Sequence, residues 1–151
     1  MADVLPKVSV IVSSMNNEET IETCLESLLA QNYPKDHIEI ILVDGCSKDK
    51  TVQLAKKYPI KIYQTKLNCP AAYNYAQKIA CHPILGFVDS DAKVEVNWLR
   101  KLVTRLDDVD VGGVSGSIDT WNADNAWARS IGYELRARYS RIGRYTGRIA
   151  T

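Results

Sequence analysis

The sequence predicts an α/β fold in which a mostly parallel sheet is flanked by helices. Short apolar segments rich in β-branched residues alternate along the chain with amphipathic segments of helical periodicity. The 151 residues are 46% hydrophobic and 25% charged, which is the balance of a domain that can bury a core. Polar residues follow directly after three of the apolar segments, as they do where parallel strands end at a ligand site.

Each predicted strand is a short apolar run, the pattern of a strand that helices cover on both faces. In chain order we expect strands at residues 8–12, 38–43, 60–63, 84–88 and 109–117. The last of these is interrupted by glycines. Strands joined through helices favour right-handed crossovers and a parallel sheet.

The predicted helices follow the strands. In the first of them Ile21, Leu25 and Leu28 recur at helical spacing behind an acidic first turn, which favours the positive end of a helix. We expect helices over residues 18–31, 49–58, 71–80 and 95–106. Apolar residues from Ala126 to Ile142 form the stripe of one more helix, with arginines on its other face.

The charge is distributed unevenly along the chain. Nineteen Lys and Arg against 18 Asp and Glu leave a formal charge of +1, which argues against a dedicated nucleic-acid-binding protein. The acidic residues prevail in residues 1–120, whereas residues 121–151 contain six Arg and two acidic residues. We therefore expect an α/β domain over residues 1–120 and an Arg-rich helical segment over residues 121–151. This segment is expected to lead into a further half of the protein beyond Thr151.

The cellular location is predicted from what the sequence lacks. No apolar run reaches the roughly 18 residues of a membrane span, and the first residues do not resemble a signal peptide. The four cysteines show neither metal-ligand spacing nor a compact disulfide framework, so we expect reduced thiols. These observations indicate a soluble, cytoplasmic chain.

Two carboxylates stand at the end of the fourth predicted strand. Asp89 and Asp91 flank Ser90 directly after the apolar run 84–88. Two carboxylates so placed can share Mg²⁺ or Mn²⁺, which prefer hard oxygen ligands and can bridge phosphate oxygens. A solvated turn explains an isolated Asp-x-Asp equally well, so the hypothesis depends on the loops after the other strands.

Asp44 ends the second predicted strand and has two interpretations. In the turn that follows, Gly45 is expected to permit unusual backbone angles, and Ser47 or Asp49 can cap the next helix. Capping leaves Asp44 itself unexplained, because this residue precedes the turn. Its carboxylate could instead accept hydrogen bonds from a base or ribose.

Four segments, taken together, resemble the family 2 glycosyltransferases, whose fold is the Rossmann-like GT-A fold. They match in order and spacing over residues 7 to about 118. The segments are residues 8–18 (VSVIVSSMNNE), residues 20–34 (TIETCLESLLAQNYP), residues 43–51 (VDGCSKDKT) and residues 87–92 (FVDSDA) with Trp98 and Leu99.

The resemblance implies an inverting, metal-dependent transfer of a sugar from a nucleotide-diphosphate donor of the UDP or GDP type to an acceptor hydroxyl. Mn²⁺ or Mg²⁺ would be the cofactor, with Asp91 as the principal metal ligand and Asp89 contacting the ribose or the metal. Asp44 would contact the base. The remaining nucleotide-sugar-binding positions that the resemblance implies are Ser13, Met15, Glu18, Asn68, Asn74 and Ser90.

The sequence departs from the family pattern in three places. The family usually has Pro at Ser13 and an aromatic residue at Met15, and its second carboxylate after Asp44 is replaced by Gly45. Methionine can still pack against a base through its polarizable sulfur. The family's acceptor segment and catalytic base would follow Thr151, so the fold is expected to be incomplete at its C-terminus. Among the upstream carboxylates, only Asp119 could substitute for that base.

Other functions remain to be weighed. A non-catalytic nucleotide-binding or interaction module of the same fold is the main alternative. A dinucleotide-binding domain is excluded because no Gly-x-Gly-x-x-Gly follows the first strand. A phospho-receiver domain is excluded because this sequence lacks the acidic residues that such a domain has after its first and third strands. The arginines from Arg129 to Arg148 form either a solvated helix face or a surface attracted to the phosphate groups of a lipid-linked acceptor or an anionic membrane. A polysaccharide is the other acceptor that we expect.

Overall fold

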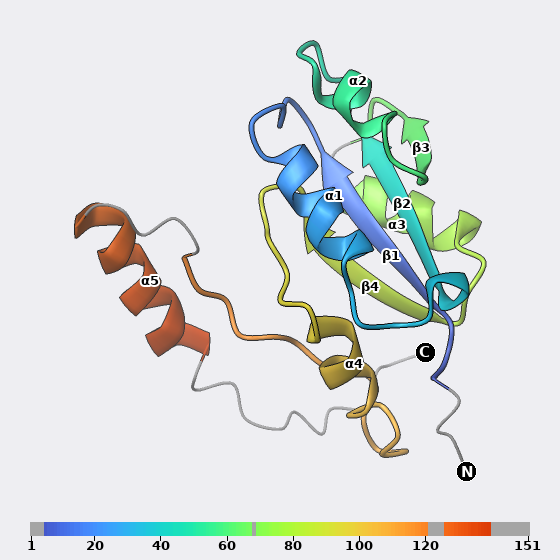
Figure 1. The fold of residues 1–151 in the computed structure, drawn as a ribbon, viewed down its shortest axis with the longest axis vertical. Helices are drawn as coiled ribbons and strands as arrows, with labels where there is room; N and C mark the ends of the chain where they lie inside the picture. The colour runs from blue at the N-terminus through green and yellow to red at the C-terminus, as the bar shows by residue number, and fades with distance from the viewer. Residues whose placement is uncertain (1–4, 68, 121–125, 140–151) are drawn as a thin grey trace. The chain divides into compact units, whose positions relative to one another are not determined.

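A four-stranded sheet forms the centre of the structure, a computed structural model that describes residues 5–67, 69–120 and 126–139 (Figure 1). All neighbouring strands are parallel, and their order is β3-β2-β1-β4. The strands are β1 (Val8–Ser14), β2 (Ile38–Asp44), β3 (Lys61–Gln64) and β4 (Ile84–Asp89). The predicted parallel α/β fold is confirmed, and so are the first four predicted strands.

The predicted helices are present, and the first, second and fourth of them are shorter than the apolar periodicity suggested. They are α1 (Ile21–Leu29), α2 (Thr51–Ala55), α3 (Cys69–Ile79), α4 (Trp98–Val103) and α5 (Ala126–Tyr139). A one-turn helix, η1 (Lys35–His37), precedes β2. Ile142, which was expected to extend the apolar stripe of the last helix, lies outside the described residues. No helix in the described part of the chain has the length and apolar character to span a bilayer.

The core lies on both faces of the sheet because successive strand residues point to opposite sides. On one face α3 packs on β1 and β2, and Ile11, Ile41 and Val43 are buried with Ala72 and Ala76 of the helix. Helix α1 lies on the other face (Figure 1) and buries an apolar stripe of its own. Burying each large aliphatic side chain contributes about 1.5–3 kcal/mol, so this double layer fixes the sheet.

The predicted strand at residues 109–117 is wrong. These residues are described, and none of them is in a strand. Gly112, Gly113 and Gly116 weaken β structure because they lose much backbone entropy and offer no side chain to pack. Val109, which should have contributed to the core, is 97% exposed.

The described residues fall into two compact units, which divide between Leu99 and Arg100. The first unit contains the sheet and the loops at its carboxyl edge. The second contains α5. The boundary expected at residue 120 adjoins the undescribed residues 121–125 and stays a prediction.

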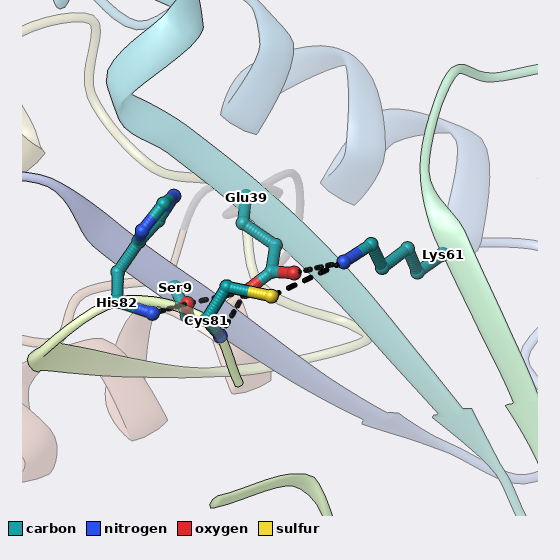
Figure 2. A network of polar contacts seen from close by, with 5 residues as sticks. All are labelled: Ser9, Glu39, Lys61, Cys81 and His82. Atoms are coloured by element: carbon teal, nitrogen blue, oxygen red, sulfur yellow. Dashed lines mark hydrogen bonds and ion pairs between the residues drawn. The ribbon is translucent and has the colours of Figure 1, made fainter. Parts of the chain in front are cut away.

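A buried carboxylate fastens the amino end of the sheet (Figure 2). Glu39 of β2 accepts hydrogen bonds from Ser9 of β1 and from the Cys81 N–H at 2.9 Å, and it forms an ion pair with Lys61 of β3. The His82 N–H donates to Ser9 Oγ at 3.2 Å. Burial raises the pKa of Glu39, but the bonds from Cys81, Lys61 and Ser9 outweigh it and lower the pKa to about 2. The turn before β4 is thus tied to three strands.

Candidate functional site

The strand order places the three polar loops at one edge of the sheet. β1 lies between β2 and β4, so the chain runs one way from β1 to β3 and then crosses to the other side of β1. Ser13 is aligned with Val43 on one side and with Asp89 on the other. In open α/β sheets ligands bind outside such a reversal, at the carboxyl ends of the strands. The predicted convergence of the loops is confirmed.

The loops after β1 and β2 are joined to each other by hydrogen bonds between backbone and side chain. Their distances are 2.8–3.1 Å, and they link Asn16 to Ser47, Asn16 to Lys48, Asn17 to Thr51, Glu18 to Asp49, and Glu18 to Lys50. Each loop also has a non-glycine residue with positive φ, Asn16 at 56° and Cys46 at 62°. Such backbone costs about 1–3 kcal/mol unless neighbours hold it, and here the loops hold each other.

Asp44 is fully buried, and its carboxylate is occupied within the protein. It accepts hydrogen bonds from Ser14 Oγ at 3.2 Å, from the Ser47 N–H at 2.8 Å and from Gln64 Nε2 at 3.2 Å, and a further one from Ser47 Oγ. A buried carboxylate needs such donors. The structure therefore gives Asp44 a definite role in joining β1, β2 and β3, while its contact with a base stays a prediction.

The turn after Asp44 differs from expectation in two respects. The residue with the unusual backbone is Cys46, whereas Gly45 has no positive φ. An added Cβ at Gly45 would lie 3.3 Å from Met15 Cβ, a tight contact to which Met15 would have to yield. Of the two expected helix caps, Asp49 accepts a hydrogen bond from the Thr51 N–H at 3.0 Å. Ser47 instead accepts a hydrogen bond from the Asn16 N–H through its Oγ and donates its own N–H to Asp44.

The acidic pair stands at the end of β4. Asp89 and Asp91 are exposed, and the side chain of Ser90 between them is buried. Tyr73 of α3 donates its hydroxyl to Asp89 Oδ1 at 3.0 Å. Ser90 Oγ donates to Asn17 Oδ1 at 2.9 Å, so its hydroxyl points into the protein and away from solvent. Whether Ser90 contacts a nucleotide stays a prediction.

The buried thiol of Cys24 lies close to this acidic pair. It is fully buried in α1 and lies 3.5 Å from the carbonyl oxygen of Asp89. Burial, followed by the charges of Asp91 and Asp89, raises the pKa of Cys24 to about 12. Both carboxylates therefore lie near enough to Cys24 to disfavour its thiolate.

A pocket of about 280 Å³ opens beside Asp91. Its lining is polar and comes from the first and second loops and the end of β4: Asn16, Asn17, Glu18, Glu19, Thr20, Asp49 and Asp91. Glu18, expected near the nucleotide, is thus at the pocket. The described residues contain no group of three or more His, Cys, Asp or Glu side chains arranged to hold a metal ion.

The remaining predicted residues lie in different places. Met15 is 64% exposed beside Gly45, and Ser13 is half-buried in β1. Asn74 is exposed on α3, and Asn68 lies outside the described residues. Asp119, the suggested substitute base, belongs to the second compact unit.

Two residues at this edge were not predicted from the sequence. Tyr73 reaches Asp89 from α3, and Asn17 connects three loops. A helix tyrosine normally indicates packing, which here is present as well, because the Tyr73 ring meets Phe87 edge to face at 5.1 Å. Nothing in its spacing distinguishes Tyr73 from a core residue. Asn17 follows Asn16 in the first loop, but its partners are distant in sequence.

Comparisons with known proteins agree with this geometry. A family model described as "Glycosyl transferase family 2" matches residues 9–149. "Glycosyltransferase AglE" of Haloferax volcanii is 31% identical over 126 residues, which are 79% of this chain and 41% of that protein.

Two solved structures are similar. Staphylococcus aureus TarS in complex with UDP-GlcNAc has a TM-score of 0.62 and 29% identity, over 78% of this chain and 42% of that one. The mannosyltransferase PcManGT of Pyrobaculum calidifontis, in complex with GDP-Man and Mn²⁺, has a TM-score of 0.53 and 30% identity, over 58% and 28%. The chain thus spans less than half the length of each. The expected GT-A fold is confirmed.

Proposed function

This chain belongs to glycosyl transferase family 2, and on that premise we propose that it forms the nucleotide-sugar-binding part of an inverting glycosyltransferase. The enzyme would move a sugar from a UDP- or GDP-linked donor to an acceptor hydroxyl. The observation that carries the proposal is the exposed pair Asp89 and Asp91 beside a polar pocket, at the edge where three loops converge. Similar proteins are solved with UDP-GlcNAc and with GDP-Man.

The acidic pair fits a divalent cation. Asp89 and Asp91 offer exposed carboxylate oxygens, the ligand type that Mg²⁺ and Mn²⁺ prefer. A bound ion would supply charge neutralisation for the departing nucleoside diphosphate. The protein's own part is to hold the two carboxylates in place, which Tyr73 does for Asp89 through its hydroxyl.

The donor nucleotide is proposed to lie along the loops after β1 and β2. Met15 is exposed directly after β1 and can pack on a base, and Ser13 stands in β1 between the ends of β2 and β4. Glu18 and Asp49 bind backbone N–H groups of the opposite loop and so keep the two loops together. These two carboxylates thereby fix the shape of the pocket that they line.

Binding of UDP and of GDP to the 151-residue chain tests the proposal. We expect calorimetry to detect binding of one of them in the presence of Mn²⁺, and the metal-dependent part of the affinity to be lost in Asp91→Ala. Asp36→Ala is a matched control, because Asp36 is an exposed carboxylate at the amino end of β2. No binding of either nucleotide, or unchanged Mn²⁺-dependent affinity in Asp91→Ala, would refute the site.

Catalysis needs a separate test, since a non-catalytic module of the same fold would also bind nucleotide. Transfer or donor hydrolysis by a longer natural form of the protein, lost in Asp91→Ala, would support an enzyme. Tight nucleotide binding with no turnover in that form would support the module.

The acceptor and the location extend the proposal. We infer a lipid-linked or polysaccharide acceptor and a cytoplasmic protein that associates with the membrane surface. The support is the arginine content of α5, where Arg129 is exposed. Sedimentation with vesicles of anionic phospholipid should capture the chain at low salt, and less of Arg129→Ser. Equal binding to neutral vesicles would contradict the membrane association.

A further inference from the structure

Asn17 is the residue at which the three loops of the site meet. Its backbone N–H donates to Thr51 Oγ1 at 2.8 Å, at the start of α2, and its carbonyl accepts from the Ile21 N–H at 2.9 Å, at the start of α1. Its side-chain Oδ1 accepts from the Met15 N–H at 3.0 Å and from Ser90 Oγ at 2.9 Å. One half-buried side chain thus connects the first loop to the acidic loop after β4.

We propose that Asn17 is a positioning residue of the donor site, which sets the place of Asp89 and Asp91 through Ser90. This inference rests on the proposed function. Ser90 stands between the two carboxylates, so any displacement of its backbone moves both of them. Its side chain is 5% exposed, and a buried hydroxyl needs a hydrogen-bond partner. Asn17 provides that partner from a residue 73 positions away.

The direction of this hydrogen bond follows from the partners. The Met15 N–H can only donate, so the atom of the Asn17 amide that it meets is the oxygen. Ser90 must then donate its proton to the same oxygen. The hydroxyl proton is therefore committed to Asn17, and the oxygens of Asp89 and Asp91 do not receive it.

The side chain of Asn17 can be tested separately from its structural role. The bonds to Thr51 and Ile21 are made by the backbone, so they remain in any substituted protein. The bonds to the Met15 N–H and to Ser90 are made by the side chain, and both are lost in Asn17→Ala. Ser90→Ala removes only the bond between Ser90 and Asn17.

A double-mutant cycle on nucleotide affinity tests the coupling. With Mn²⁺ and UDP or GDP, we expect Asn17→Ala and Ser90→Ala each to weaken the metal-dependent affinity about fivefold, the usual effect of one hydrogen bond. The double variant should bind no more weakly than Asn17→Ala alone. The affinity measured without metal should fall less than the Mn²⁺-dependent affinity in each variant. Asn32→Ala is the control, because this exposed residue at the far end of α1 bonds Asn97 instead.

Additive losses in the double variant, or unchanged Mn²⁺-dependent affinity in Asn17→Ala, would overturn the inference while leaving the proposed function intact. A second measurement does not need nucleotide. Titration with Mn²⁺ alone should broaden the NMR signals of the Ser90 and Asp91 amides, and less so in both single variants. If the unsubstituted protein shows no such broadening, Asn17 positions no metal site and the inference fails, whereas nucleotide binding in that sample would still support the proposed function.

Discussion

Replacing Glu39 with glutamine should destabilise the protein at neutral pH. The carboxylate holds the turn before β4 through the Cys81 N–H and pairs with Lys61, and its pKa falls from the ordinary value of 4.5 to about 2. A shift of that size corresponds to about 3 kcal/mol in favour of the charged form of Glu39. Solvent screens the half-exposed Lys61, so its ion pair contributes less of this free energy than its geometry suggests. We expect Glu39→Gln to lower the free energy of unfolding by about 2–3 kcal/mol at pH 7.

The stabilisation by Glu39 should depend on pH. Because the pKa of Glu39 is lower in the folded protein than in the unfolded chain, its stabilisation is complete above about pH 4.5 and is lost as the pH falls toward 2. Urea unfolding of both proteins at pH 7, 4 and 3 should therefore show the difference between them shrinking on acidification. A difference that is constant with pH, or below about 0.5 kcal/mol at pH 7, would refute the reasoning.

Two further predictions concern the carboxyl edge, and a third concerns the cysteines. Asp44→Asn should lower the free energy of unfolding in urea by about 2 kcal/mol, because an amide cannot satisfy all the buried donors that face it; a loss near zero would contradict this. Tyr73→Phe should keep the fold and weaken Mn²⁺-dependent nucleotide affinity about threefold by freeing Asp89, as measured by calorimetry, and unchanged affinity would count against it. At pH 8 a thiol reagent should label the exposed Cys81 but not the buried Cys24, whose pKa is about 12, until the protein unfolds; mass spectrometry that found both labelled equally in the native protein would disprove this.

Local patterns were sufficient to predict the layered fold. The apolar runs that became β1 and β2 each fill a strand that is mostly buried, and their length and composition leave few alternatives. The same reasoning failed at residues 109–117, where apolar residues are mixed with glycine and no face is buried. Periodicity detects a segment that could pack, and whether it packs depends on the rest of the fold.

The candidate site was predictable in outline, because the loops after parallel strands must meet where the strand order reverses. This places Ser13, Asp44 and Asp89 at one edge from sequence and topology together. The burial of Asp44 was not predictable. Its donors include Ser14 from β1 and Gln64 from β3, and these reach it only once the strands are in register.

The sequence by itself determined the alternation of strands and helices, the uneven charge, and the acidic pair Asp89 and Asp91, since each of these depends on residues close together in the chain. Only the tertiary structure decided that Ser90 bonds Asn17, that Tyr73 supports Asp89, and that Cys46 rather than Gly45 adopts the strained backbone. The physical reason is that hydrogen-bond partners act over about 3 Å in space, whatever their separation in sequence.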